Sequence, residues 1–392
     1  MPVAQKIHGF IERSSWIRAM FEAGAKLKAE VGAENVYDFS LGNPNLEPPA
    51  AFNQVMRRLV AEEAPGQHAY MPNAGYPAVR AKVAGHLNRL HGVAFGENEI
   101  IMTVGAAGAL NIVLKAIVDP GAKVVVPTPY FVEYDFYLDN HGGSVTRVPT
   151  KADFTLDVAA IAQAVDHDTC AVLINNPNNP SGAVYPASQI AELAKALTDI
   201  GKRRGRAVYL ISDEPYRQIV YEGATVPSVF AAYPHSIVVT SFSKNLSLPG
   251  ERIGYAAVHP EIDDKGMLIA GMTLANRILG YVNAPGLMQR AVAELLEHTA
   301  DVAEYARKRD LICAVLEAAG YAFNKPLGAF YVFPQSPIAD DVAFVREAQK
   351  ENLLLVPGSG FMGPGFFRIA FCCADETITR SAEAFKRVRA KF

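Results

Sequence analysis

The sequence predicts an α/β protein with a mostly parallel β-sheet covered by helices, together with a smaller α+β domain. In the middle of the chain, short apolar and β-branched runs alternate with longer segments whose apolar residues recur at helical spacing. Near-continuous apolar strands are typical of parallel sheets that helices cover on both faces. In the last third of the chain this alternation stops and helical patterns dominate, which favours a second domain.

The expected elements of the sheet follow one another in order. The apolar runs that we interpret as strands are 99–103, 122–126, 170–175, 207–212 and 236–240. The segments between them that have helical spacing are 108–118, 130–140 and 187–202. This alternation places the large domain at residues 68–284.

The remaining residues, 1–67 and 285–392, are assigned to the small domain. Its expected elements are a long helix over 287–318, strands over 330–333 and 366–371, and a closing helix over 375–391. We expect the N-terminal segment to pack with this C-terminal part.

Composition excludes several classes of protein. The chain has 37 lysines and arginines and 40 aspartates and glutamates, so its net charge is −3. This charge argues against a protein that binds the phosphates of nucleic acids. The four cysteines, Cys170, Cys313, Cys372 and Cys373, have no metal-ligand spacing and predict a reducing cytoplasm. No apolar run approaches the roughly 20 residues needed to span a bilayer, and the first ten residues do not form a secretory signal. We therefore expect a cytoplasmic protein that binds no metal, nucleic acid or membrane.

Chemically distinctive motifs follow the carboxyl ends of four expected strands. In chain order they are GAAG at 105–108, NPNNPSG at 176–182, DEPY at 213–216 and SFSK at 241–244. Ligands of such sheets bind beyond the carboxyl ends of the strands. The four motifs are therefore expected to share one site.

The first motif could bind an anion. Residues 105–108 precede a helix, so their backbone N–H groups could face a phosphate. Ser241, Ser243 and Arg252 could add hydroxyl donors and a guanidinium to the same group. The alternative is an ordinary turn between a strand and a helix, with serines that only shape a loop.

Lys244 and Asp213 could carry the chemistry. A lysine among apolar neighbours can have a lowered pKa and act as a Schiff-base nucleophile. An aspartate at a strand end can hold a positively charged ring nitrogen. The alternatives are a surface lysine and an aspartate that caps the next turn. The conjunction of all these motifs favours the functional interpretation.

These motifs resemble those of class I and II aminotransferases, the fold type I enzymes that depend on pyridoxal 5′-phosphate. SFSK is followed by Pro249-Gly250 and by RIGY at 252–255. Asp213 lies 31 residues before Lys244, and Arg252 lies 8 residues after it. The other matching motifs are LGNP at 41–44, Tyr70 with Gly75, PTPYF at 127–131, the asparagine–proline motif, GAFY at 328–331, Pro357-Gly358 and Arg368. The resemblance covers nearly the whole chain. It implies an aspartate aminotransferase-like enzyme whose large cofactor domain contains a mostly parallel, seven-stranded sheet.

The resemblance assigns Lys244, Asp213 and Tyr216 to catalysis. Lys244 would form the internal aldimine with the cofactor and carry a proton between the substrate α-carbon and the cofactor C4′ carbon. Asp213 would pair with the protonated pyridine nitrogen, which keeps the ring an electron sink. Asn179 and Tyr216 would hydrogen-bond the phenolic oxygen, and Phe131 would stack on the ring.

The phosphate of the cofactor would be held by the turn and the loop that carries the lysine. The residues implied are Ala106, Ala107, Ser241, Ser243 and Arg252. Tyr70 would reach the phosphate of the partner subunit, which implies a homodimer with active sites at the subunit interface. The Ala106-Ala107 pair departs from relatives that have polar side chains here, including a lysine at position 107 in some aspartate-using relatives.

Arg368 would clamp the substrate α-carboxylate in a bidentate pair, with help from Asn179 and the backbone of Gly42. Recognition of the substrate side chain stays open. Arg277 weakly resembles a partner-subunit arginine that reads a distal carboxylate in some aspartate aminotransferases, but it fits a capping or surface residue equally well. Apolar or aromatic candidates for this pocket include Trp16 and Tyr130.

The expected reaction moves the amino group of an L-amino acid to a 2-oxo acid by a ping-pong mechanism, as part of amino acid metabolism. The alternative is a pyridoxal-phosphate-dependent β-lyase or related elimination enzyme, because the same fold supports several reactions. A third hypothesis is a cofactor-sensing regulator without turnover. The near-neutral charge and the early start of the fold along the chain argue against such a regulator.

Overall fold

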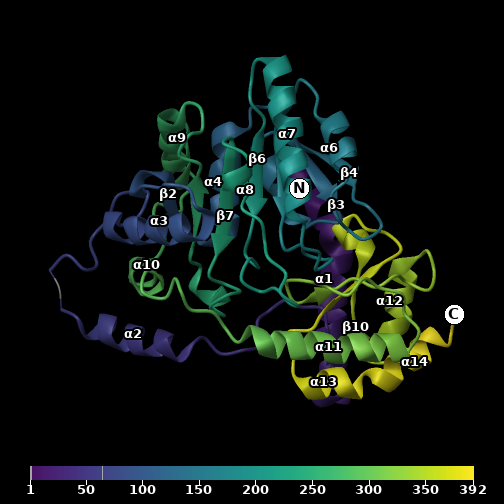
Figure 1. The fold of residues 1–392 in the computed structure, drawn as a ribbon. Coiled ribbons are helices and arrows are strands. Elements are labelled where there is room, and N and C mark those ends of the chain that lie inside the picture. The colour runs from purple at the N-terminus through teal and green to yellow at the C-terminus, as the bar shows by residue number, and fades with distance from the viewer. Residues whose placement is uncertain (1, 64) are drawn as a thin grey trace. The chain divides into compact units, whose positions relative to one another are not determined.

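The larger of two compact units in this computed structural model is built on a seven-stranded sheet (Figure 1). The structure describes residues 2–63 and 65–392, and it describes the side chains of all of these except residues 12–23. The strands are β2 (Ile100–Thr103), β3 (Lys123–Thr128), β4 (Ser144–Pro149), β5 (Thr169–Asn175), β6 (Tyr209–Asp213), β7 (Ser236–Ser241) and β8 (Gly254–Val258). Their order in the sheet is β2-β8-β7-β6-β5-β3-β4. Among these described strands, β8 alone runs in the direction opposite to the other six. The predicted mostly parallel α/β fold is confirmed.

Helices cover both faces of this sheet, as its apolar strands require. The helices described in the larger unit are α2 (Ala50–Ala61), α3 (Pro77–His91), α4 (Gly105–Ile117), α5 (Glu133–Asn140), α6 (Val158–Ala164), α7 (Ala187–Arg204), α8 (Val229–Ala232), α9 (Lys265–Ile278) and α10 (Gly286–Val292). Alternate strand residues such as Met102 and Leu210 join one hydrophobic core with α3, α6 and α7. Ile101 and Ile211, which are next to them in the sequence, are equally buried on the other face. On that face α4 packs on β7 and β8.

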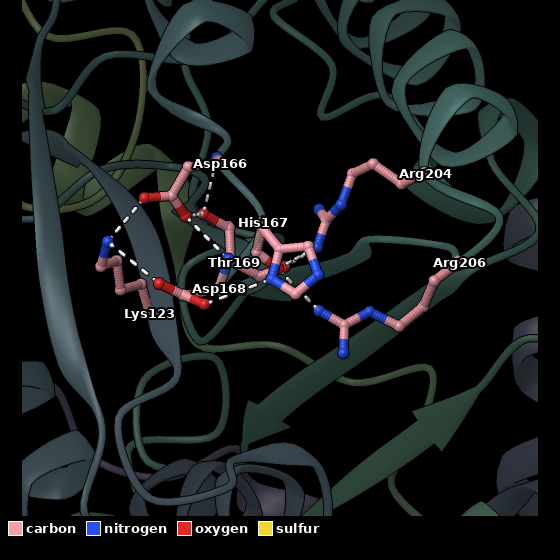
Figure 2. Close-up of polar contacts among 7 residues, drawn as sticks. All are labelled: Lys123, Asp166, His167, Asp168, Thr169, Arg204 and Arg206. Carbon is pink, nitrogen blue, oxygen red and sulfur yellow. Dashed lines mark hydrogen bonds and ion pairs between the residues drawn. The ribbon is translucent and has the colours of Figure 1, made fainter.

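Polar contacts connect the amino ends of β3 and β5 with the C-terminal end of α7 (Figure 2). Lys123, the first residue of β3, pairs with Asp166 at 2.6 Å and with Asp168 at 3.6 Å, in the loop before β5. Arg204 and Arg206, at the end of α7, donate to the carbonyl oxygen of His167 at 2.8 and 3.0 Å. These contacts tie β3, β5 and α7 together at this edge. The motifs predicted to be functional follow the opposite edge of the sheet.

The smaller unit comprises residues up to Asn45, Ala303–Pro326 and Phe330–Phe392. Its helices are α1 (Gln5–Val31), α11 (from Val302 to Ala318), α12 (Asp341–Gln349), α13 (Asp375–Arg380) and α14 (Ala382–Arg389). β1 (Tyr37–Asp38) pairs with β10 (Leu353–Leu354), and β12 (Phe367–Ala370) lies between β11 (Val356–Pro357) and β9 (Tyr331–Val332). Tyr321, Phe344, Phe367 and Phe385 pack against one another in its core.

The compact units divide the chain after Asn45 and before Ala303, whereas the sequence places these boundaries at residues 67 and 285. The reason is that α2 and α10 pack together in the larger unit. Phe52 and Leu59 of α2 join the same hydrophobic core as Met288 and Ala291 of α10. Arg58 fixes this packing at the surface by donating to both carboxylate oxygens of Glu294, at 2.5 and 2.6 Å.

The helix expected over 287–318 is two helices, α10 and α11. The chain between them turns so that Ala293, Leu295 and Leu296 are buried in the core of the larger unit. The N–H of Ala300 donates to the carbonyl oxygen of Asn245 at 2.5 Å. Burial of these apolar side chains therefore overrides the helical pattern. Within the described part of the chain, each helix is too short or too polar to cross a membrane.

Candidate functional site

Asp213 ends the buried strand β6 and is 5 % exposed. Its Oδ2 accepts a hydrogen bond from the hydroxyl of Tyr134 at 2.6 Å. Its Oδ1 is buried and has no hydrogen-bond partner among the described residues. Burial raises the pKa of Asp213 to about 7, against the lowering effect of the Tyr134 hydrogen bond, and the charge of Glu214 adds to the rise. The carboxyl therefore offers one open acceptor to a cationic group.

The neighbouring strand β5 fixes the position of Asp213. The side-chain amide of Asn175, the last residue of β5, donates to the carbonyl oxygen of Asp213 at 2.9 Å. The Asn175 side-chain oxygen in turn accepts from the N–H of Asn179 at 2.6 Å. Asn179, buried in the asparagine–proline motif, is thus brought to the same edge of the sheet as Asp213.

Lys244 lies in the loop after β7, next to β6 in the sheet. It is half-buried, and its Nζ is 6.0 Å from the centre of the Tyr216 ring. Tyr216, in the loop after β6, is itself buried. The lysine amino group and the tyrosine therefore lie close together at the carboxyl edge of the sheet.

The antiparallel strand β8 assembles the expected phosphate site. Gly254, which begins β8, pairs with Thr103 at the end of β2 and with Ser241 at the end of β7. A Cβ at Gly254 would overlap the carbonyl oxygen of Thr240 and lie 3.0 Å from the Gly105 Cα. Only glycine permits this close approach.

Arg252 and helix α4 meet at the same point. α4 begins at Gly105, which has a φ of +81°, and no side chain caps its first turn. The Arg252 guanidinium donates to the carbonyl oxygens of Pro249 at 3.0 Å and Val104 at 3.4 Å. A helix N-terminus beside a guanidinium is a site for an anion. Ala106 and Ala107 form the first turn of this helix.

Phe131 and Tyr70 are the remaining predicted cofactor residues. Phe131 is half-buried and packs edge-on against Tyr134, with ring centres 5.8 Å apart. Phe131 therefore contacts the tyrosine whose hydroxyl is bonded to Asp213. Tyr70 is 94 % exposed.

In the smaller unit, Arg368 is 8 % exposed and held on two sides by aromatic rings. Its guanidinium carbon lies 4.7 Å from the centre of the Tyr331 ring and 4.6 Å from that of Phe361. One Nη donates to the carbonyl oxygen of Ser40 at 2.7 Å. Gly42 also belongs to this unit, and a Cβ there would overlap the Tyr331 hydroxyl. Arg368, Tyr331 and Gly42 thus form one cluster.

The candidates for substrate side-chain recognition have different surroundings. Arg277 is exposed in the last turn of α9. The buried Tyr130 donates its hydroxyl to Asp135 and accepts from Arg147, both at 2.9 Å. Its ring stacks on that of Tyr134. The side chain of Trp16 lies outside the described residues.

Sequence reasoning missed Tyr134 and Asn175. Tyr134 follows Phe131 by three residues, the spacing that puts two side chains on one side of a helical turn. Asn175 is a polar residue at the end of an otherwise apolar strand. Both signals are present in the sequence, but neither says which acceptor the side chain reaches.

The chemistry of the larger unit fits pyridoxal phosphate. The open Asp213 Oδ1 suits a protonated pyridine nitrogen, and the Lys244 amine suits the aldehyde. The uncapped start of α4, Arg252 and the buried serines Ser241 and Ser243 suit the phosphate.

Comparisons with known proteins agree with this chemistry. The family model for aminotransferase class I and II matches residues 33–385. The aspartate/prephenate aminotransferase of Thermus thermophilus is 32 % identical over 353 residues, which are 88 % of this chain and 89 % of the relative. A solved amino transferase from Eubacterium rectale is 39 % identical with a TM-score of 0.96, covering 100 % of this chain and 99 % of the other. A solved mutant of Thermus thermophilus aspartate aminotransferase is 30 % identical with a TM-score of 0.85, covering 94 % of this chain and 95 % of the other.

Proposed function

The chain belongs to the class I and II aminotransferase family, and on that basis we propose that it is a pyridoxal-phosphate-dependent enzyme with a ping-pong cycle. In the first half-reaction an L-amino acid gives up its amino group and leaves as a 2-oxo acid. In the second half-reaction another 2-oxo acid takes the amino group. The observation that carries the proposal is the buried Asp213 carboxyl, with Oδ1 open, at the same sheet edge as Lys244.

Pyridoxal phosphate, when bound, supplies an electron sink for the negative charge that develops on the substrate α-carbon. Lys244 would bind the cofactor through its Nζ. Once the substrate amine had displaced this nitrogen from the cofactor, the freed Nζ would move the α-proton. Asp213 Oδ1 accepts the N–H of the pyridine ring and keeps that nitrogen protonated. Asn179 and Tyr216 hydrogen-bond the phenolic oxygen, and Phe131 covers a face of the ring.

The phosphate is bound by backbone and side-chain donors. The N–H groups of Ala106 and Ala107 at the start of α4 face it, so their lack of polar side chains does not remove these donors. Ser241 and Ser243 add hydroxyls, and Arg252 adds charge. Tyr70 completes the phosphate site of a partner subunit in a homodimer, and its 94 % exposure suits a residue that acts on another chain.

Arg368 binds the substrate α-carboxylate, helped by Asn179 and the Gly42 backbone. The rings of Tyr331 and Phe361 hold the guanidinium plane in place, which favours bidentate pairing with a carboxylate. Among the described residues, Cys170, Cys313, Cys372 and Cys373 form no disulfide, as suits an enzyme of the reducing cytoplasm.

The test is a panel of L-amino acids assayed with 2-oxoglutarate or pyruvate. Without an acceptor, the loaded enzyme is expected to release one equivalent of 2-oxo acid and stop. Addition of a 2-oxo acid is expected to restart turnover. Continuous release of pyruvate and ammonia from a sulfur amino acid, with no amino acid formed from the acceptor, would instead establish a β-lyase.

A further inference from the structure

Tyr134 is the partner of Asp213, and neither the sequence motifs nor the family match gives it a role. The two side chains are joined by a 2.6 Å hydrogen bond and are almost completely buried, with Tyr134 0 % and Asp213 5 % exposed. The tyrosine takes up one carboxylate oxygen of Asp213. The other oxygen, Oδ1, keeps no partner among the described residues. The hydrogen bond thus determines which oxygen stays open.

The Tyr134 ring is held in one orientation by its neighbours. It stacks on the ring of Tyr130, with centres 6.0 Å apart and planes 3° from parallel, and it packs edge-on against Phe131. A hydroxyl held this firmly can position its acceptor without first losing rotational freedom.

Electrostatics makes Tyr134 a permanent donor. Burial and the nearby Asp213 charge raise the pKa of Tyr134 well above its ordinary value of 10.0, so its proton remains in place at neutral pH. Its hydrogen bond lowers the pKa of Asp213, whereas burial and Glu214 raise it. The tyrosine therefore favours the carboxylate form of Asp213 in surroundings that otherwise favour the acid.

We propose that Tyr134 is a positioning residue: its hydrogen bond to Oδ2 of Asp213 directs Oδ1 towards the ring nitrogen of the cofactor. The same bond keeps the proton that Oδ1 and the ring nitrogen share on the ring nitrogen. This role rests on the proposed function, because it needs pyridoxal phosphate as the ligand. Without the tyrosine hydroxyl, the carboxylate becomes more basic. The shared proton then moves from the ring nitrogen towards Asp213, and the ring withdraws electrons less strongly.

The test uses Tyr134→Phe, which removes the hydroxyl and keeps the aromatic stack. The matched control is Tyr130→Phe, which removes a buried hydroxyl from the same stack but one that is bonded to Asp135 and Arg147. Each protein is loaded with pyridoxal phosphate labelled with ¹⁵N in the ring, and the chemical shift of that nitrogen is measured. We expect the signal of Tyr134→Phe to move towards the unprotonated value and that of Tyr130→Phe to match the wild type.

Single-turnover rates give a second readout. A hydrogen bond to a charged group of the strength seen in proteins corresponds to a loss of between about 10- and 100-fold in the half-reaction of Tyr134→Phe. Because the tyrosine acts through the carboxylate, we expect the Asp213→Asn, Tyr134→Phe double variant to be no slower than Asp213→Asn alone. The double variant also shows whether the loss needs the Asp213 charge or reflects general damage to the fold.

The outcomes separate the two proposals. A wild-type protein that does not bind pyridoxal phosphate, or binds it without amino transfer, overturns the proposed function. An active wild-type enzyme whose ¹⁵N signal is unchanged by Tyr134→Phe overturns the role of Tyr134 alone. Equal shifts in Tyr134→Phe and Tyr130→Phe would likewise overturn it, because the effect would then belong to the aromatic stack.

Discussion

Gly254 of β8 lies so close to Gly105 of α4 that a Cβ at position 254 would be 3.0 Å from the Gly105 Cα. This approach brings the strand after Arg252 against the turn expected to bind phosphate. An added methyl group would have to push the two segments apart, and inserting a carbon into a well-packed core typically costs about 1–3 kcal/mol. The proposed phosphate site therefore depends on a residue that has no side chain.

We expect Gly254→Ala to lower the thermal midpoint of the apoprotein and to weaken pyridoxal phosphate binding, measured by calorimetry and by fluorescence titration. Gly250→Ala is the control, because Gly250 lies four residues before Gly254 and a Cβ there meets no atom within 4 Å. Gly250→Ala should match the wild type in both measurements. Equal cofactor affinity in Gly254→Ala and the wild type would show that the close approach does not shape the phosphate site.

Asp213→Asn should abolish most of the chemistry and leave much of the cofactor binding. The amide can still bond Tyr134, but it brings no charge to keep the pyridine nitrogen protonated. We expect half-transamination to slow by roughly 10³-fold or more, about 4 kcal/mol at 1.36 kcal/mol per decade. Stopped-flow absorbance with excess amino donor measures this rate. A near-normal rate would contradict the role of the carboxylate.

The same variant makes a prediction about stability and pH. Burial raises the pKa of Asp213 from 3.8 to about 7 in the folded apoprotein. Between these values the folded state retains a proton that the unfolded state releases, so this carboxyl makes the protein less stable as pH rises. The stability gained by Asp213→Asn should therefore grow up to about pH 7 and then level off, as followed by calorimetry of the apoprotein.

Asp166→Asn provides a control of opposite sign. The hydrogen bond from Lys123 is the main cause that lowers the pKa of Asp166 from 3.8 to about 2. Its stabilising contribution is therefore complete above about pH 4 and is lost only as the pH falls through about 2. The effect of Asp166→Asn should be flat over the range in which that of Asp213→Asn grows. A flat profile for Asp213→Asn would show that its carboxyl titrates normally.

Lys244 should carry the cofactor covalently. Reduction of the loaded protein with borohydride is expected to fix the cofactor on the Lys244 Nζ, which peptide mapping by mass spectrometry locates. Lys244→Ala should retain no fixed cofactor and no transamination. Lys195→Ala, which changes an exposed lysine on α7, should be labelled like the wild type. A label on another lysine of the wild-type protein would refute the assignment.

Arg368→Lys should impair every amino donor to a similar degree. A lysine loses the planar fork that lies between Tyr331 and Phe361, and a point charge cannot reproduce a bidentate pair. We expect kcat/KM to fall by roughly 10-fold or more, about 1.4 kcal/mol, for both an acidic and a neutral donor. A loss confined to one donor class would assign Arg368 to the substrate side chain instead.

Arg277→Ala is the companion measurement. A selective loss of kcat/KM for aspartate or glutamate would show that Arg277 reads a distal carboxylate. Unchanged values for both donor classes would place it among surface residues, as its exposure in α9 suggests. Specificity would then have to come from other side chains, such as the apolar and aromatic ones.

The sheet edge that carries the site was predictable from the sequence because the strands are strongly apolar and end at polar motifs. β6 and β7 are buried along nearly their whole length, so their boundaries are clear. Asp213 and Lys244 follow these boundaries directly or within a few residues. Because β6 and β7 are parallel neighbours in the sheet, Asp213 and Lys244 come to the same edge regardless of how the loops are shaped.

Other features depend on partners that are distant in the sequence. β8 is a short run, GYAAV, and its antiparallel pairing with β2 joins residues such as Thr103 and Gly254. Tyr134 reaches an acceptor 79 residues away. The break between α10 and α11 reflects burial of Leu295 and Leu296 in the core of the larger unit. A local sequence pattern does not identify the distant residue that a side chain will contact.

The place of β2 at the edge of the sheet has a consequence for the order of assembly. Among the described strands β2 pairs only with β8, so the turn at Gly105 has no neighbour in the sheet until Gly254–Val258 have been synthesised. Because domains tend to fold as units once their last strands are available, a nascent chain that stops before residue 254 contains the lysine but not a finished cradle for the phosphate. We therefore expect the proposed phosphate cradle to form only after nearly two thirds of the polypeptide has left the ribosome.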